Sequence, residues 1–441
     1  MIADEESFLN EYQIILTTPE KCFNEAIRSG LGRLHELGVL NRIIIDEAHM
    51  AFHTTLEFRP EYGKIFNLIQ KFYNCNVVVA SATLPEEGFK GIQTLLNKKG
   101  RVVLKGSTFR SNIVIVNINS SDVFEPTNIL DSVKRIMDLK KHFYCNERIK
   151  GICVASTREA TKTVTQLFNS YGIRAIEYHS KIKELSRPEV FKKWQTEDME
   201  LLVTCDSNLT GLDPKRCDYI IHYSLPMYIS TYIQEIGRLN RDGRIAFALL
   251  YTTSEVNKVY KKRSAGKKQD ISEANKRLSD IISQCSEASV QRQRIQNLYL
   301  KGELDEMEKL MDKFSNNCIH SIMLNYCDNI QLKSCIFNCF TCIKKYADKT
   351  LSNLNNEIQD FNSTKIAVIN KNDPTVIQKK EKLTLLYKEW YNRANGGNLP
   401  PKKAFPELSI EDIFKIRGYN LPGNNKRKAD EANINEYVDL P

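Results

Sequence analysis

Short β-branched runs that alternate with helical patterns constrain the fold of this chain more than any other feature. The first such runs are residues 12–16, 42–45 and 76–80, and polar residues follow each of them. Residues 58–72 carry apolar side chains three and four positions apart, which is the spacing of a helix. Strands separated by helices favour a doubly wound parallel sheet, and such sheets bind ligands at the carboxyl ends of their strands.

The same alternation returns in a second block, which predicts a second parallel α/β unit. Helical spacing is found at residues 158–171 and 188–194. The predicted strands of this block are residues 152–155, 175–178, 201–204, 219–222 and 247–250.

A polar stretch at residues 117–126 reads as a linker between the two blocks. Beyond residue 345 the chain is rich in Asn and Lys, with one amphipathic helix predicted at residues 376–393. We therefore predict four segments: a first lobe at 1–116, a second lobe at 117–260, a helical domain with cysteines at 261–345, and a helical or disordered tail at 346–441.

Composition sets only broad limits on function. The formal charge of +9 suits a polyanionic partner, although many soluble proteins are equally basic without binding one. No apolar run approaches the ~18 residues of a membrane span. The first six residues are acidic, unlike the start of a secretory signal, so we expect an intracellular protein.

Asp46-Glu47-Ala48-His49 follows the apolar run at 42–45. At a strand end, an Asp can hold Mg²⁺ on nucleotide phosphates and the adjacent Glu can polarise an attacking water. Acidic residues after strands are also common without such a role. The segment Ser81-Ala82-Thr83, which follows the next predicted strand, favours the nucleotide interpretation.

Gln234-Glu235-Ile236-Gly237-Arg238-Leu239-Asn240-Arg241 places two arginines three residues apart on a short helix. A guanidinium that reaches across a cleft can neutralise charge on a phosphoryl group as it transfers. The alternative is a basic surface helix. Upstream, Gly211 allows close backbone approach and Asp213 can orient an arginine, although a plain turn explains both residues equally well.

A phosphate loop is missing from the 441 residues, because Gly-x-x-x-x-Gly-Lys-Ser/Thr does not occur in them. The pairs Gly63-Lys64 and Gly266-Lys267 lack both the earlier glycine and the following hydroxyl residue. The sequence therefore carries two parts of a nucleotide site without the backbone cradle that normally holds the phosphates.

Five of the 12 cysteines fall between residues 318 and 342, whereas the other seven are scattered. Cys318, Cys335, Cys339 and Cys342 are spaced so that four thiolates can close a tetrahedral zinc site. We expect Cys327 to be a bystander. Free structural cysteines are the alternative.

These segments, in this order and at these intervals, resemble the superfamily 2 helicases and, more closely, the RecQ family. The resemblance covers roughly residues 10 to 345, and its most specific part is Phe58-Arg59-Pro60-Glu61-Tyr62, which eight residues separate from His49. Leu324-Asn325-Tyr326 is similar to the zinc domain of that family. Further similar segments are residues 18–21, 109–113, 178–180 and 234–243.

The resemblance implies an α/β protein with two RecA-like doubly wound lobes, the first one incomplete, followed by a helical zinc-binding domain. It implies an ATP-dependent DNA helicase that moves 3′ to 5′ and serves DNA unwinding, recombination and repair in the nucleus. ATP, Mg²⁺ and Zn²⁺ would be the cofactors. Single-stranded DNA and duplex junctions would be the partners.

The family's roles fall on residues already singled out. Asp46 would hold Mg²⁺ and Glu47 would activate water, while Gln234, Arg238 and Arg241 would complete the site across the cleft between the lobes. Gly211 and Asp213 would lie near the nucleotide. His49 with Ser81, Ala82 and Thr83 would link hydrolysis to the grip on the DNA strand.

Nucleic-acid contacts are expected on loops at strand ends rather than on one basic patch. Thr18, Arg59, Ser156, Thr157 and Arg158 are the candidates, because short hydroxyls and Arg suit phosphate contact. Each of them can equally be a local cap or a surface residue. The lysines and arginine within 261–268 form either a nucleic-acid surface or, as we favour, a solvated linker, and Lys426-Arg427-Lys428 is a weak signal for nuclear import.

Three departures from the family bear on activity. The phosphate loop and the adenine-reading segment would lie upstream of Met1. The family's Trp that couples DNA contact to hydrolysis matches Thr54 here, with Phe52 as the aromatic nearby. Residues after 345 do not resemble the family's winged helix. We therefore expect weak or no ATPase from this chain alone.

Two alternatives from other classes stay open. One is a non-catalytic fragment of helicase origin in which the second lobe and the zinc domain bind DNA or a partner. The other is an RNA helicase of the same superfamily, against which the cysteine spacing and residues 58–62 argue.

Overall fold

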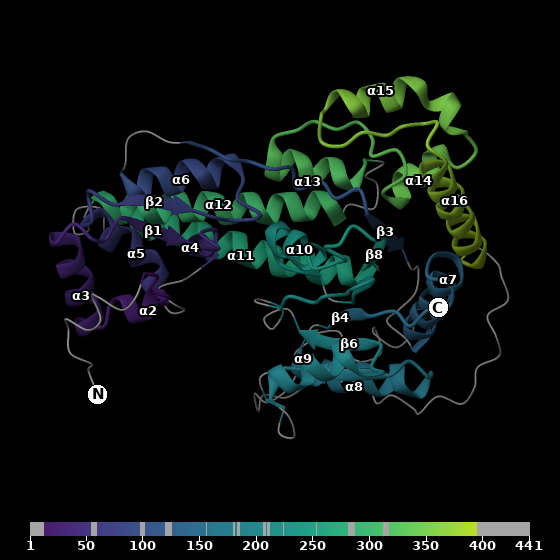
Figure 1. The fold of residues 1–441 in the computed structure, drawn as a ribbon, viewed down its shortest axis with the longest axis horizontal. Helices are drawn as coiled ribbons and strands as arrows, with labels where there is room; N and C mark the ends of the chain where they lie inside the picture. Colours follow the sequence, from purple (N-terminus) through teal and green to yellow (C-terminus); the bar gives the residue numbers. More distant parts are fainter. Residues whose placement is uncertain are drawn as a thin grey trace, which may run out of the picture.

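The computed structural model describes residues 13–53, 60–97, 102–119, 126–155, 157–179, 181–182, 186–205, 209, 212–223, 225–252, 254–280, 287–311 and 317–394. The chain forms two α/β lobes, a long helical hairpin that runs along both, and a helical domain that carries the clustered cysteines (Figure 1). The α/β class expected from the sequence, with parallel sheets followed by a helical cysteine domain, is confirmed.

The first lobe contains a two-stranded parallel sheet within the described residues. Strand β1 (Arg42–Ile45) pairs with β2 (Asn76–Val79), and both were expected from the sequence. Packed around them are the helices α2 (Pro19–Cys22), α3 (Glu25–Glu36), α4 (Met50–His53), α5 (Pro60–Gln70) and α6 (Glu86–Leu96).

The strand predicted at residues 12–16 is wrong where the structure describes it. Residues 13–16 form no strand, and the side chains of Ile14 and Leu16 are 78% and 93% exposed. Ile44 of β1 is also 65% exposed, so one face of this small sheet carries uncovered apolar side chains. An apolar run indicates that its side chains favour burial. It does not indicate whether a neighbouring strand is available to pair with it.

The second lobe is built on a six-stranded parallel sheet in the order β3-β8-β7-β4-β6-β5. All five strands predicted for this block are confirmed to within two residues at each end. The strands are β3 (Ile113–Asn119), β4 (Gly151–Ala155), β5 (Ala175–Tyr178), β6 (Leu201–Cys205), β7 (Tyr219–His222) and β8 (Ala246–Thr252). The helices are α7 (Pro126–Phe143), α8 (Arg158–Ser170), α9 (Arg187–Thr196) and α10 (Ile229–Ile236).

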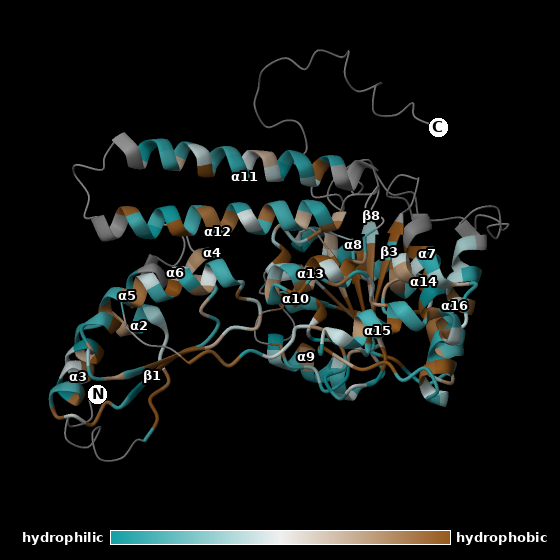
Figure 2. Ribbon diagram, turned by 90° about the horizontal axis from the view of Figure 1, so that it is seen from above, coloured by the Kyte–Doolittle hydropathy of each residue, from teal (hydrophilic) through white to brown (hydrophobic). Residues whose placement is uncertain are grey.

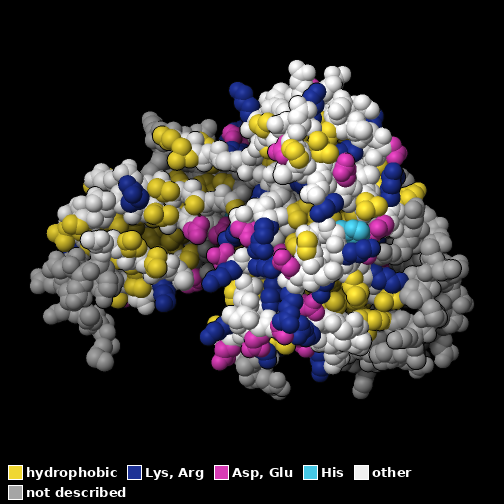
Figure 3. Space-filling model, turned by 45° about the vertical axis from the view of Figure 1, so that its right-hand side comes forward, with side chains coloured by type: hydrophobic (Ala, Val, Ile, Leu, Met, Phe, Trp, Pro, Cys, Tyr) yellow, Lys and Arg dark blue, Asp and Glu magenta, His cyan; other side chains and the backbone are white. Residues whose placement is uncertain are grey.

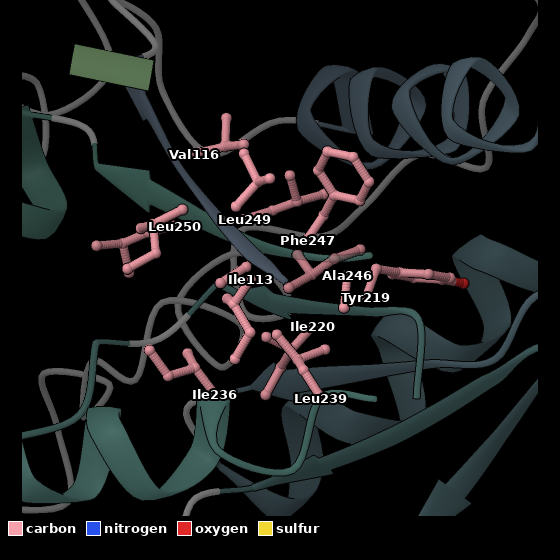
Figure 4. Close-up of a cluster of buried hydrophobic side chains, with 14 of the residues drawn as sticks. Ile113, Val116, Tyr219, Ile220, Ile236, Leu239, Ala246, Phe247, Leu249 and Leu250 are labelled. Atoms are coloured by element: carbon pink, nitrogen blue, oxygen red, sulfur yellow. The ribbon is translucent and has the colours of Figure 1, made fainter. Parts of the chain in front are cut away.

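The core of this lobe lies between the sheet and its helices, where side chains of β3, β7 and β8 meet those of α10 (Figure 4). The strands β4, β6 and β7 are buried along their whole lengths, as central strands of a parallel sheet are. Gly151 at the start of β4 is needed because a Cβ there would lie 2.1 Å from the ring of Tyr219.

The predicted boundary between residues 116 and 117 falls inside β3. That strand pairs with β8 in register from Ile113↔Ala246 to Asn119↔Thr252, so it belongs to the second lobe. The chain therefore changes lobe earlier, within the extended segment at 102–112. The boundaries predicted at 260/261 and 345/346 likewise fall inside helices, which polar composition alone did not reveal.

A helical hairpin of α11 (Ser254–Asp280) and α12 (Glu287–Met311) follows the second sheet. Figure 2 shows the two helices side by side, with α11 largely hydrophilic. The basic residues within 261–268 therefore lie on a helix, and the linker interpretation is wrong. Lys268 binds Asp305 and Glu308 of α12 at 2.7 and 2.8 Å, so part of that charge serves the hairpin.

Helix α12 connects the parts of the molecule, because it packs on α4 and α6 of the first lobe and on α10 of the second. Tyr299 of α12 stacks on Phe52 with ring centroids 4.4 Å apart. Gly91 of α6 allows this approach, since a Cβ there would lie 2.6 Å from Ile295 Cγ2 and 3.2 Å from Phe52 Cζ.

The cysteine domain and the segment after it fold back on the second lobe. Its elements are α13 (Ile319–Asp328), α14 (Phe340–Tyr346), the 3₁₀ turn η2 (Leu351–Leu354), α15 (Asn355–Ser363) and α16 (Pro374–Ala394). The amphipathic helix predicted at 376–393 is confirmed as α16, and Trp390 at its end packs under Arg135 of α7, 4.4 Å from the ring centroid. Residues 346–394 are therefore part of the folded body.

No helix in the described part of the chain is both long and apolar enough to cross a membrane.

We predict that Gly91→Ala loosens the contact between α6 and α12, because the new methyl group must displace Ile295 or Phe52. Overpacking of this kind costs about 1–3 kcal/mol. Hydrogen exchange of residues 86–96 should accelerate relative to the native chain. Gly30→Ala in α3 is the matched control, since no atom lies within 4 Å of its added Cβ, and it should leave exchange in α6 unchanged. Equal exchange of α6 in the two variants would contradict the packing described for α12.

Candidate functional site

A cavity of about 720 Å³ lies between the two lobes and is closed on one side by α13. The space-filling view shows a hollow between the lobes, with Lys and Arg side chains gathered in a band beside it (Figure 3). Residues from both sequence motifs line the cavity. They include Glu47, Ser81, Ala82, Thr83, Arg110, Asp213, Gln234, Arg238, Arg241 and Asp328.

The acidic corner of the cleft follows β1 directly. Asp46 is exposed, and its Oδ1 accepts a 2.9 Å hydrogen bond from the backbone N–H of Glu47. Glu47 has a φ of 48°, an uncommon conformation for a residue with a side chain. The N–H of Ala48 then pairs with Ala80 O beyond β2 at 3.0 Å. This turn places two carboxylates at the carboxyl end of the first sheet.

The environment of this corner shifts the pKa of two of its groups. Burial, with the nearby charge of Asp46, raises the pKa of Glu47, and Arg238 from the second lobe opposes that shift. Burial, reinforced by His53, lowers the pKa of His49 to about 3. His49 is therefore neutral at pH 7, with one ring nitrogen that donates and one that accepts.

Gln234 of α10 joins the second lobe to this corner. Its Nε2 lies 2.8 Å from His49 Nε2, and more distantly 3.4 Å from Glu47 Oε2 and 3.5 Å from Thr83 Oγ1. If the amide donates to His49 Nε2, the proton of the ring is on Nδ1, which lies 3.0 Å from Ser81 Oγ. The two motifs that lie almost two hundred residues apart in sequence thus meet through one side chain.

The two arginines differ in their surroundings. Arg238 donates to the carbonyl of Leu212, and its Nε is buried without a hydrogen-bond partner among the described residues. Burial lowers the pKa of Arg238, opposed by attraction to Glu235. Arg241 is half exposed and pairs with Asp213 at 2.6 Å. Such an exposed pair contributes at most about 1 kcal/mol, so Arg241 is free to change partners.

Three further groups support α10 and were not found from the sequence. Arg110, in the segment between the lobes, donates to the carbonyls of Gly237 and Asn240 at 2.9 and 2.6 Å. Beneath α10, His222 Nε2 lies 2.8 Å from Oε2 of Glu235, whose pKa burial raises to about 8. Glu235 lies inside the motif at 234–241, and residues 109–113 resemble a family segment, but neither pattern gave Arg110, His222 or Glu235 a role.

The nucleic-acid candidates within the described residues are helix caps or lie beside one. Thr18 caps α2 by accepting from Lys21 N, and Thr157 caps α8 by accepting from Ala160 N. Arg158, the first residue of α8, is exposed. Phe52 is 1% exposed and packed on Tyr299, so it offers no free face for a base. The candidates Arg59, Ser156 and Gly211, and the position of Thr54, lie outside the described residues.

The four expected cysteines form one buried cluster, and Cys327 is not part of it. Their sulfur atoms lie within 4.8 Å of one another. A tetrahedral Zn²⁺ site with Zn–S bonds of about 2.3 Å has sulfur atoms about 3.8 Å apart, so the cluster is compatible with zinc. Hydrogen bonds from the other three thiols lower the pKa of Cys342, whereas burial raises the pKa of Cys318 and Cys335.

Local structure explains how these cysteines come together. Cys318 and Cys339 stand immediately before α13 and α14, so two helix starts bring their sulfur atoms into the cluster. The N–H of Cys335 donates to Cys318 Sγ at 3.3 Å, and Ser334 Oγ donates to Cys342 Sγ at 3.2 Å. These hydrogen bonds stabilise negative charge on sulfur, as the second shell of a thiolate metal site does.

Comparison with known proteins gives two family matches. The DEAD/DEAH box helicase family matches residues 2–90, and the helicase conserved C-terminal domain matches residues 134–243. A superposition on Mycobacterium smegmatis helicase Lhr bound to ssDNA and AMP-PNP has a TM-score of 0.41, with 17% identity over 56% of this chain and 32% of that chain.

Curated relatives point to one branch of the helicases. The chain is 28% identical to ATP-dependent DNA helicase hus2/rqh1 of Schizosaccharomyces pombe and 29% identical to RecQ-like DNA helicase BLM of Xenopus laevis, in both cases over 54% of this chain and 17% of the relative. It is 25% identical to ATP-dependent helicase SGS1 of Saccharomyces cerevisiae, over 68% of this chain and 20% of that protein. The chain thus spans a fifth or less of these three relatives.

Proposed function

From the premise that this chain is a RecQ-like protein of helicase superfamily 2, we propose that it takes part in ATP-driven DNA unwinding with 3′ to 5′ polarity. The observation that carries the proposal is the position of Gln234. Its amide reaches His49 at 2.8 Å across the cleft, so residues that would sense the nucleotide in one lobe contact the other lobe directly.

In the proposed site each charged residue has a role that its surroundings suit. Asp46, an exposed carboxylate at the end of β1, holds Mg²⁺, which takes oxygen ligands and neutralises charge on the phosphates. Glu47 orients the attacking water, and its raised pKa brings it closer to that of a general base. Arg238 and Arg241, which both line the cavity, stabilise the charge of the transferring phosphoryl group.

The coupling between hydrolysis and DNA grip runs along hydrogen bonds in the cleft. Ser81 contacts His49, His49 contacts Gln234, and Gln234 lies 3.5 Å from Thr83. A change at Glu47 reaches this series of hydrogen bonds through the 3.3 Å contact between Glu47 Oε2 and His49 Nδ1. Thr83 and Ala82 thereby report the nucleotide state to the surface that meets the DNA.

DNA, as single strands and duplex junctions, is the proposed partner, with contacts from Thr18, Thr157 and Arg158 and, outside the described residues, from Arg59 and Ser156. Asp213 sets the position of Arg241. Gly211, which lies outside the described residues, would allow close backbone approach to the nucleotide. Roles in recombination and repair, and a nuclear location, are proposed on the likeness to the curated relatives.

The missing phosphate loop sets the expected rate. Within these 441 residues no Gly-x-x-x-x-Gly-Lys-Ser/Thr cradles the phosphates, so we propose that the chain by itself hydrolyses ATP slowly. A second function is favoured by the same observation together with the burial of Phe52: a non-catalytic module that binds DNA or a partner. The two proposals differ in whether any turnover depends on Glu47.

We predict weak DNA-stimulated ATP hydrolysis, below about 1 s⁻¹, the low end of ordinary enzyme turnover. Glu47→Gln should abolish it, because the amide cannot activate water. Arg238→Ala should lower kcat at least about 10³-fold, as loss of an arginine finger does. Arg244→Ala is the matched control, because the side chain of Arg244 binds only its neighbour Asp242 in the contacts described, and this variant should keep full turnover.

Three outcomes of this assay would each contradict part of the proposal. Turnover that survives Glu47→Gln would come from another site or another protein. No turnover at all, with normal affinity for DNA, would instead support the binding module. Fast turnover that depends on Glu47 would leave the assignment of the site intact but would overturn the proposed impairment.

We also propose that Cys318, Cys335, Cys339 and Cys342 bind one structural Zn²⁺. Cys335→Ala is predicted to lose the metal and to unfold the cysteine domain, because zinc binding free energy is folding free energy. Cys327→Ala is the matched control, since this thiol is also buried but lies outside the cluster. Metal quantification on both variants and on the native chain tests the prediction. Loss of zinc from Cys327→Ala, or a native chain without zinc, would overturn it.

A further inference from the structure

We propose that α13 holds the arginine-bearing segment 237–241 in place through the chain between the lobes, with Asp328 and Arg110 as positioning residues. The helix begins next to the cysteine cluster at Cys318 and ends at Asp328, on the wall of the cleft. The inference rests on the proposed function only in the part of its test that measures enzyme activity.

The first link joins α13 to the interlobe segment. The side chain of Asp328 is only 3% exposed. Its Oδ2 accepts hydrogen bonds from the backbone N–H of Thr108 at 2.8 Å and from Thr108 Oγ1 at 2.9 Å, and Ser107 Oγ lies at 3.4 Å. Lys105 adds a bond from its Nζ to the carbonyl of Cys327. Hydrogen bonds to a buried carboxylate are short and strong, so residues 105–108 are fixed to the end of α13.

The second link joins the same segment to α10. Arg110, two residues beyond Thr108, donates to the carbonyls of Gly237 and Asn240, on either side of Arg238. Gly237 is the residue at which α10 ends, where carbonyls lack partners within the helix and a guanidinium is favoured by the helix dipole. Nearby, Asn112 Nδ2 donates to the carbonyl of Asn240 at 3.0 Å and to that of Arg244 at 2.8 Å.

Helix α13 also reaches the opposite end of α10. Tyr326, two residues before Asp328, donates to the fully buried carboxylate of Glu303 on α12. The other oxygen of Glu303 accepts from the N–H of Ser230 at 2.9 Å, in the first turn of α10. Both ends of the helix that carries Gln234 and leads to Arg238 are therefore tied to α13.

A physical consequence follows for Arg238. The guanidinium of Arg238 must stay within hydrogen-bonding reach of the cleft. The backbone that carries it is held by Arg110. Arg110 lies two residues beyond Thr108, which Asp328 binds. A misplacement of about 1 Å in such a group can cost about 100-fold in rate. An intact cluster of Cys318, Cys335, Cys339 and Cys342 should thus be needed for the position of the arginines, although none of these four residues contacts an arginine in the hydrogen bonds described.

Hydrogen exchange of the full-length chain, without nucleotide, tests this directly. The amides of Gly237, Arg238, Leu239 and Asn240 are all hydrogen-bonded, so their exchange reports the stability of the segment. Asp328→Ala and Arg110→Ala should each accelerate exchange across 237–243 about 10-fold, the effect of losing a charge-assisted hydrogen bond. The double variant should accelerate it no further, because both changes break one pathway.

Two controls separate positioning from general damage. Asp360→Ala removes a half-exposed carboxylate of the helical region that follows the cluster, one that pairs only with Lys333 among the contacts described, and should leave 237–243 unchanged. Asp328→Asn keeps an oxygen that can accept from Thr108 and should restore most of the protection. Zinc content is measured on every sample and should equal that of the native chain.

Unchanged exchange at 237–243 in Asp328→Ala, with faster exchange at 102–110 alone, would overturn the proposal. So would faster exchange throughout the second lobe together with loss of zinc, because Asp328 would then be a residue of general stability. If Asp328→Ala does not fold, Arg110→Lys, which cannot reach both carbonyls, decides the second link alone.

The activity readout is separate from these measurements. A native chain that does not hydrolyse ATP would contradict the proposed function but would not affect the hydrogen-exchange result. Where hydrolysis is measurable, Asp328→Ala should lower kcat about 10- to 100-fold with little change in KM, because the arginines act in the transition state. A change in KM alone would contradict the positioning role.

Discussion

The packing of α12 against both lobes is the contact on which the cleft depends. On one side Tyr299 stacks on Phe52 of the first lobe, and on the other Glu303 accepts from Ser230 at the start of α10. Because a single helix makes both contacts, the lobes are held at a fixed separation. Gln234 can then reach His49 at 2.8 Å, and residues from two distant motifs form one site.

The sequence predicted the second lobe well because its central strands are continuous apolar runs that only a buried parallel sheet accommodates. It failed at residues 13–16, where an apolar run pairs with no strand in the described part of the chain. It also placed a boundary inside β3, because Asn117 and Asn119 look like loop residues although their backbones pair with β8. Pairing over long sequence separations decided these cases, and local composition does not carry that information.

The candidate site shows the same division. Asp46, Glu47 and the cysteines could be proposed from the sequence because their spacing is itself a chemical signal. Arg110 and Asp328 were not, since each acts on a carbonyl or an N–H more than one hundred residues away. Charged residues of this kind look like surface residues in the sequence. Only the fold shows that they connect the cysteine cluster, the segment between the lobes and the arginines.

We propose that the contact through Gln234 makes the grip on DNA depend on the nucleotide. The affinity for 3′-tailed DNA, measured by fluorescence anisotropy with and without millimolar Mg²⁺ and a non-hydrolysable ATP analogue, tests this coupling. We expect a change of about 5-fold or more, the usual size of coupling between two sites, and its loss in Gln234→Ala. Equal affinity with and without nucleotide in the native chain would rule out the coupling and indicate a module that only binds DNA.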